Sequence, residues 1–136
     1  VQENALADNL LQAVWRKQEE MGGAALPADS LPEFITNRAT FLLMAHEGSI
    51  ILEDGQMAFT EAGQQRADEL IRRHRLAERL FYETFSLDED RLHENALKLE
   101  PLWSPEVIDK ICAFLHHPKT CPHGDPIPRG ACCPKN

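Results

Sequence analysis

Two histidines and two glutamates recur at spacings that could bring them to a metal ion. In RRHRLAERLF, His74 and Glu78 are four residues apart, so a helix places them on one face. His93 and Glu100 are seven residues apart and would share a face of the next helix. If the two helices pack antiparallel, His74, Glu78 and His93 converge. Two imidazoles and a carboxylate suit divalent Mn, Fe, Co, Ni or Zn.

A purely structural interpretation of the same residues is also open. Glu78 could pair with Arg75 or Arg79 on its own helix. Both histidines could then be ordinary half-buried side chains. Spacing alone does not separate this interpretation from a metal site.

The C-terminal stretch CPHGDPIPRGACC holds a second group of metal ligands. Three of the four cysteines lie in it, and its prolines and glycines exclude helix and strand while letting the backbone wrap around an ion. Four thiolates could hold an iron–sulfur cluster, or thiolates with a histidine could hold zinc. Free thiols are the third alternative. The candidate cluster or zinc ligands are Cys112, Cys121, His123, Cys132 and Cys133.

The first half of the chain has the element order helix–helix–helix–hairpin. Apolar residues at helical spacing predict a first helix that ends at Gly22. Pro27 opens a second helix through about residue 35, and a third covers about residues 37–47. In SIILEDGQMAFT, apolar runs flank Asp54 and Gly55, which is typical of a hairpin. This is the order of a winged helix-turn-helix.

Three more helices are predicted over the residues that carry the first metal site. Thr60 can cap a long helix over about residues 61–85. Ser86 and Glu89 form a capping box for a helix that continues to about residue 99. Ser104, followed by a proline, caps a last helix through about residue 115.

The predicted fold is therefore mainly α, with three parts. Residues 1–60 form a winged helix-turn-helix domain with a small β-hairpin wing. Residues 61–115 form an all-helical metal-binding and dimerisation domain, and residues 116–136 form an irregular tail rich in cysteine and proline. The apolar faces of the helical domain exceed what three helices cover, which favours a homodimer.

Composition and charge restrict the function further. The net charge is −8, and residues 1–60 carry nine acidic and three basic residues, which argues against general affinity for nucleic acid. No secretory signal and no run long enough to span a bilayer is seen, so we expect a cytoplasmic protein with reduced thiols and no membrane partner. We predict no enzymatic activity, because no catalytic triad order, phosphate loop or paired catalytic carboxylates occur.

Four runs between residues 57 and 128 carry a family resemblance. They are FTEAGQQRADELIRRHRLAERLF, LDEDRLHENALKLE, WSPEV and HPKTCPHGDPIP. They resemble the diphtheria toxin repressor family of iron- and manganese-dependent regulators. The resemblance implies a homodimer in which a winged helix reads operator DNA and a helical domain binds Fe²⁺ or Mn²⁺, with Zn²⁺ as a substitute in crystals. As in manganese-sensing members, no SH3-like third domain is expected.

The resemblance also implies specific ligands. The two histidines and Glu78 match one family metal site. A second, regulatory site keeps Glu100 but has Leu97 and Pro101 where the family has ligands, and neither side chain offers a ligand atom. Its helix-one positions match Asn9 and Gln12.

The expected DNA contacts come from NRATFLLMAHEG, the segment that matches the recognition helix. They are Asn37, Arg38 and Thr40. The sequence thus predicts a metal-dependent DNA-binding transcriptional regulator. The alternative is a metal- or iron–sulfur-binding protein on the same scaffold that has lost operator binding, with the cysteine tail as a sensor of iron, oxygen or redox state.

Overall fold

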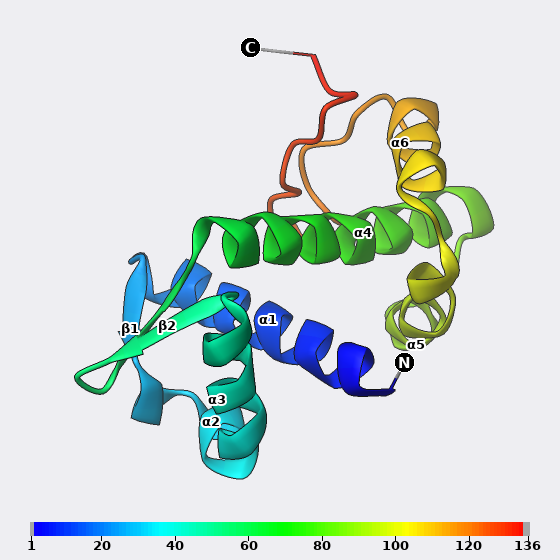
Figure 1. The fold of residues 1–136 in the computed structure, drawn as a ribbon. Coiled ribbons are helices and arrows are strands. Elements are labelled where there is room, and N and C mark those ends of the chain that lie inside the picture. Colours follow the sequence, from blue (N-terminus) through cyan, green and yellow to red (C-terminus); the bar gives the residue numbers. More distant parts are fainter. Residues whose placement is uncertain (1, 135–136) are drawn as a thin grey trace. The chain divides into compact units, whose positions relative to one another are not determined.

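The structure is a computed structural model that describes residues 2–134, with side chains from residue 5 (Figure 1). The chain divides into two compact units, and the division falls between Leu70 and Ile71, inside the long helix α4 (Glu61–Phe85). The sequence had placed a domain boundary at residue 60, just before this helix. Among the described residues, no helix combines the length and apolar character that a membrane span requires.

The first unit is a winged helix-turn-helix, as the sequence predicted. Its elements before α4 are α1 (Gln2–Met21), β1 (Ala25–Pro27), a 3₁₀ turn η1 (Ala28–Ser30), α2 (Pro32–Thr36), α3 (Arg38–Glu47), β2 (Ile50–Glu53) and β3 (Gln56–Phe59). The three strands form an antiparallel sheet in the order β1-β3-β2. The hairpin between β2 and β3 turns at Asp54 and Gly55, both with positive φ, which suits the twist of paired strands.

Strand β1 was not predicted from the sequence. It has only three residues and ends in Pro27, which is a weak strand signal. Tertiary pairing creates it, because Leu26 lies opposite Met57 and both side chains are fully buried in the core of this unit.

The start of α4 is fixed by the hairpin that precedes it. The Thr60 hydroxyl accepts the Gly63 N–H at 3.0 Å and donates to the Gly48 carbonyl at 2.6 Å, so the predicted cap is confirmed. Gly63 packs so tightly against Ser49 that a Cβ at position 63 would overlap the Ser49 carbonyl oxygen.

The second unit contains the rest of α4, α5 (Glu89–Leu99), a 3₁₀ turn η2 (Glu100–Leu102), α6 (Pro105–Phe114) and the C-terminal segment. Ser104 caps α6 through the Val107 N–H, as predicted. The capping box at Ser86 and Glu89 is wrong, because Asp88 caps α5 by accepting the Arg91 N–H at 3.1 Å.

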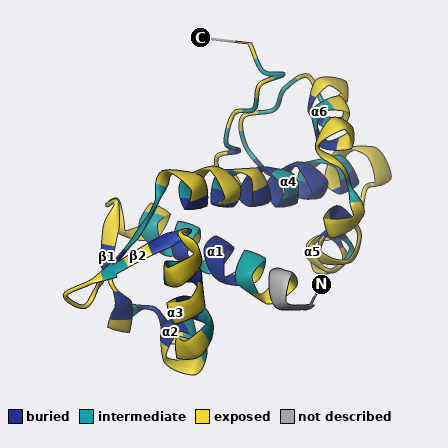
Figure 2. Ribbon diagram, viewed as in Figure 1, coloured by how far each residue is buried: buried dark blue, intermediate teal, exposed yellow. Residues whose placement is uncertain are grey.

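Two apolar clusters hold this unit together. Ala77 and Phe81 of α4 pack against Leu92 and Ala96 of α5. On another face of α4, Leu76 packs with three residues from α6 and the chain after it: Ile108, Cys112 and Ile127. Figure 2 shows buried residues along much of α4.

The C-terminal segment, residues 116–134, contains no helix and pairs only through an isolated bridge between Thr120 and Pro126. Arginines of α4 anchor it. Arg79 donates to the Thr120 carbonyl at 2.7 and 3.0 Å, and Arg75 donates to the Pro126 carbonyl. The segment is therefore irregular, as predicted, but is held against α4.

Candidate metal centres

The first centre is formed by His74, Glu78 and His93. One ligand atom from each lies within 4.8 Å of the others. A single oxygen, Glu78 Oε2, lies 3.6 Å from His74 Nε2 and 3.4 Å from His93 Nδ1. His74 and Glu78 are buried, whereas the His93 side chain is 57% exposed. A metal ion would thus have two buried ligands and one ligand that is exposed to solvent.

Glu100 lies on the other side of the His74 ring. His74 Nδ1 donates to Glu100 Oε2 at 2.8 Å, which leaves Nε2 directed toward Glu78. A carboxylate on the second ring nitrogen is how metal-binding histidines are commonly oriented. The sequence grouped Glu100 with the ligands, but the structure places it behind the centre, 3.8 Å from Arg73 Nε. Because Glu100 occupies Nδ1 and Nε2 faces Glu78, the donor set fits a divalent transition metal.

The electrostatics of the centre favour a cation. Burial lowers the pKa of His74, but hydrogen bonds and charges from Glu100 and Glu78 outweigh it and raise this pKa to about 9. Burial raises the pKa of Glu78, but its contacts with His74 and His93 lower it overall. Without a metal, the two carboxylates therefore hold a proton on the imidazole.

Glu78 also belongs to a second donor group. Cys121 and His123 of the C-terminal segment offer ligand atoms within 4.8 Å of the Glu78 carboxylate and of each other. Cys121 is buried and its Sγ lies 3.9 Å from His123 Nδ1. Two donor groups thus share Glu78: one with the histidines of α4 and α5, and one with the C-terminal segment.

The remaining cysteines form a separate group. Cys112, Cys132 and Cys133 gather with His117, and the four ligand atoms lie within 4.8 Å of one another. Burial raises the pKa of Cys112 to about 12. Burial likewise opposes ionisation of Cys133, but hydrogen bonds, first from the Gly130 N–H, lower its pKa to about 7.

The five residues that the sequence grouped as cluster or zinc ligands are therefore split between two places. Cys121 and His123 lie with Glu78, and the other three cysteines lie with a histidine that sequence reasoning missed. The four cysteines do not form one set, so an iron–sulfur cluster held by all of them is not supported. In the sequence, the one feature that could have indicated His117 as a ligand is its position five residues after Cys112.

The expected DNA contacts lie at the start of α3. Arg38 is exposed, and its guanidinium lies 4.9 Å from the centre of the Phe34 ring. Asn37 donates to the Glu33 carbonyl at 3.1 Å, and Thr40 is half-buried. Arg72 of α4 is buried in the second unit and paired with Asp109.

Residues 60–129 match the family described as iron-dependent repressor, metal binding and dimerisation domain. The chain belongs to this family, and the resemblance noted in the sequence is confirmed. It is 36% identical over 75 residues to the iron-dependent repressor IdeR of Mycobacterium tuberculosis, covering 55% of this chain and 33% of that protein. It is 32% identical over 90 residues to the diphtheria toxin repressor of Corynebacterium diphtheriae, covering 65% and 40%.

Solved structures show the same fold. A manganese-dependent transcriptional repressor in complex with manganese superimposes with a TM-score of 0.76 at 30% identity, covering 92% of this chain and 59% of that one. The chain spans between a third and two fifths of the two curated relatives named above.

Proposed function

We propose that this chain is a metal-responsive transcriptional regulator that acts in the cytoplasm as a homodimer and catalyses no reaction. The observation that supports this most directly is the convergence of His74, Glu78 and His93 in a chain of the iron-dependent repressor family. Fe²⁺ or Mn²⁺ is the proposed ligand, because two imidazoles and a carboxylate suit both ions.

In this proposal, metal on the second unit controls how two winged helices meet operator DNA. Two copies would place two α3 helices in successive major grooves, and metal would favour the spacing that fits. Arg38 is the proposed phosphate or base contact. Since residues 1–60 have nine acidic and three basic residues, DNA binding should depend on a few such cations, and its affinity should fall only modestly with salt.

The test combines metal binding with DNA binding. Calorimetry under anaerobic conditions should show Fe²⁺ or Mn²⁺ binding to the wild type and none at the same site in Glu78→Gln. A gel shift with the DNA upstream of the protein's own gene, at low salt, should then appear for the wild type with metal, and neither without metal nor for Glu78→Gln.

Two results would count against the proposal. Equal metal binding by wild type and Glu78→Gln would remove the metal centre. Metal binding without any shift, at low salt and with either ion, would mean that the scaffold binds metal but has lost operator binding. Arg38→Ala is the matched DNA-side variant, which should bind metal normally and shift DNA weakly.

A further inference from the structure

We propose that Cys112, His117, Cys132 and Cys133 form a structural zinc site, separate from the centre at Glu78. Three thiolates and one imidazole are a common closed ligand set for tetrahedral Zn²⁺. The set draws one ligand from α6, one from the turn after it and two from the far end of the C-terminal segment. Soft sulfur ligands favour zinc over manganese or magnesium.

The distances between the ligand atoms match a single ion. Bonds of about 2.3 Å to sulfur and about 2.0 Å to nitrogen at tetrahedral angles put two sulfurs about 3.8 Å apart, and sulfur and nitrogen about 3.5 Å apart. Cys112 Sγ lies 3.6 Å from Cys133 Sγ and 3.4 Å from His117 Nδ1. Cys132 Sγ lies 3.8 Å from the same nitrogen.

The same distances argue against the other uses of these cysteines. A disulfide brings two sulfurs to about 2.05 Å. In this group, Cys112 Sγ and Cys133 Sγ are 3.6 Å apart, and all four cysteines are free. An iron–sulfur cluster needs ligands spread over several irons, whereas these four atoms all lie within 4.8 Å of one another.

Groups around the site are arranged for thiolates. Arg72 is buried and donates to Cys132 Sγ at 3.1 Å, while its other terminal nitrogen pairs with Asp109 at 3.0 Å. The Gly130 N–H donates to Cys133 Sγ at 3.4 Å. Three thiolates and one Zn²⁺ leave a charge of about −1, and the guanidinium between Cys132 and Asp109 places a positive charge beside it.

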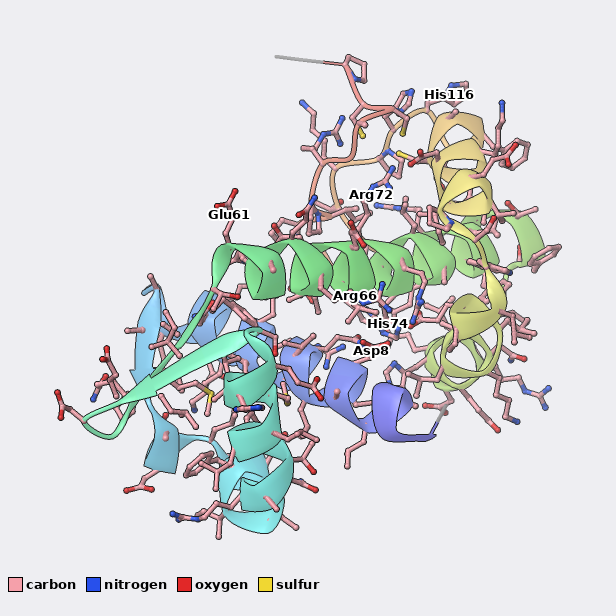
Figure 3. All side chains as sticks on the ribbon, viewed as in Figure 1. Asp8, Glu61, Arg66, Arg72, His74 and His116 are labelled. Atoms are coloured by element: carbon pink, nitrogen blue, oxygen red, sulfur yellow. The ribbon has the colours of Figure 1, made fainter. Side chains whose placement is uncertain are left out.

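The backbone is bent to deliver His117. Both His116 and His117 have positive φ, at 63° and 52°, a backbone conformation that residues other than glycine rarely adopt. The His117 N–H donates to the Cys112 carbonyl at 2.7 Å, so the chain doubles back over the end of α6. Figure 3 labels His116 at this turn and Arg72 on α4 facing the same segment. Strain of this kind persists when the surroundings require it.

The site would close a loop that contains Cys121 and His123. Zinc would then hold Cys121 and His123, which form a donor group with Glu78, in place against α4. This consequence depends on the proposed function, but the zinc site itself does not. Each thiol that binds Zn²⁺ releases its proton to solvent.

The experiment measures metal content and thiol reactivity of the full chain. Protein purified under reducing conditions should retain about one equivalent of zinc after dialysis against a weak chelator, as expected for a closed four-ligand site. By exposure alone, half-buried Cys132 and Cys133 should be alkylated before buried Cys121. Bound zinc should protect Cys132 and Cys133 from alkylation until a strong chelator removes it. Mass spectrometry of the alkylated peptides measures this protection.

Two neighbouring histidines supply a matched pair of variants. His117→Asn removes the ligand and keeps a residue that tolerates positive φ, whereas His116→Asn makes the same change at the exposed neighbour. His117→Asn should lose zinc and His116→Asn should keep it. Glu78→Gln should also keep it, which separates this site from the centre of the proposed function.

A second measurement covers the case in which His117→Asn does not fold. Cobalt substituted into Glu78→Gln should give intense visible bands and sulfur-to-cobalt charge transfer from tetrahedral thiolate ligands. Iron with acid-labile sulfide in place of zinc, a Cys112–Cys133 disulfide in the reduced preparation, or a chain without zinc whose Cys132 and Cys133 react first would each overturn the proposal.

Discussion

His74 is held between two carboxylates, and each has a different part in the proposed centre. Glu78 lies on the ligand side of the ring and Glu100 on the other. Both are more than nine-tenths buried, so neither can be replaced by water without rearrangement. The two positions can therefore be separated by mutation.

Glu100→Gln should weaken metal binding without abolishing it. The amide keeps a hydrogen-bond acceptor for His74 Nδ1 but loses the charge that makes the ring a better ligand. Loss of such an outer partner typically costs about 10–100-fold in metal affinity. Calorimetry measures this, with the exposed Glu94→Gln of α5 as control. Unchanged affinity in Glu100→Gln would show that Glu100 has no part in orienting the ring.

The raised pKa of His74 predicts how the metal-free protein responds to pH. Its pKa is about 9 in the folded chain and ordinarily 6.5, so the folded state binds this proton more tightly. The stabilisation is fully present below about pH 6.5 and is lost as pH rises through 9. Urea unfolding at both ends of this range, with chelator present, should show the loss in the wild type and a smaller loss in His74→Gln.

The same proton must leave when metal binds, because only the neutral ring can bind a metal. Metal affinity should therefore rise between pH 7 and 9. An affinity that does not change over this range would mean that the carboxylates do not hold a proton on His74.

At the scale of elements, the start of α4 depends on a glycine. Alanine normally favours a helix over glycine by about 1 kcal/mol. At Gly63, the added Cβ would overlap the Ser49 carbonyl oxygen, which belongs to the backbone and has little freedom to move. Packing should therefore outweigh propensity.

Gly63→Ala should lower the free energy of unfolding by about 1–3 kcal/mol, the usual cost of overpacking. Gly23→Ala is the control, because a Cβ there meets only the Ala25 carbonyl at 3.6 Å, an ordinary contact. Denaturant unfolding of both variants measures the difference. A Gly63→Ala protein as stable as the wild type would mean that α4 does not press on the hairpin.

At the scale of the whole molecule, the second unit leaves large apolar side chains uncovered. Leu102 is 79% exposed and Phe114 is 65% exposed. Large apolar side chains that gather on a surface are typical of an interface. A homodimer through this unit would bury them.

Leu102→Glu and Phe114→Glu should each shift the protein from dimer to monomer, because burying an unpaired carboxylate costs several kcal/mol. Light scattering after size-exclusion chromatography measures the mass. Ile35→Glu is the control, since Ile35 is 65% exposed but lies on α2 of the first unit. Wild type that is monomeric at all concentrations would contradict the homodimer.

The sequence by itself determined the helices, the hairpin and the shared helix face of His74 and Glu78, whereas the approach of His93 depends on how α5 packs against α4. These depend on local rules: apolar period, caps at Thr60 and Ser104, the turn at Asp54, and the four-residue step from His74 to Glu78. A helix converts such spacing directly into a shared face, so no knowledge of distant residues was required.

Only the tertiary structure decided which cysteine belongs with which histidine. Cys121 lies with Glu78, and Cys112 lies with His117, Cys132 and Cys133. In the same way, β1 forms because Leu26 pairs with Met57 of β3. Glu100 contacts Nδ1 of His74 because η2 directly follows α5. An irregular segment has no period, so sequence spacing cannot say where its side chains point; contacts with α4 and α6 fix its path.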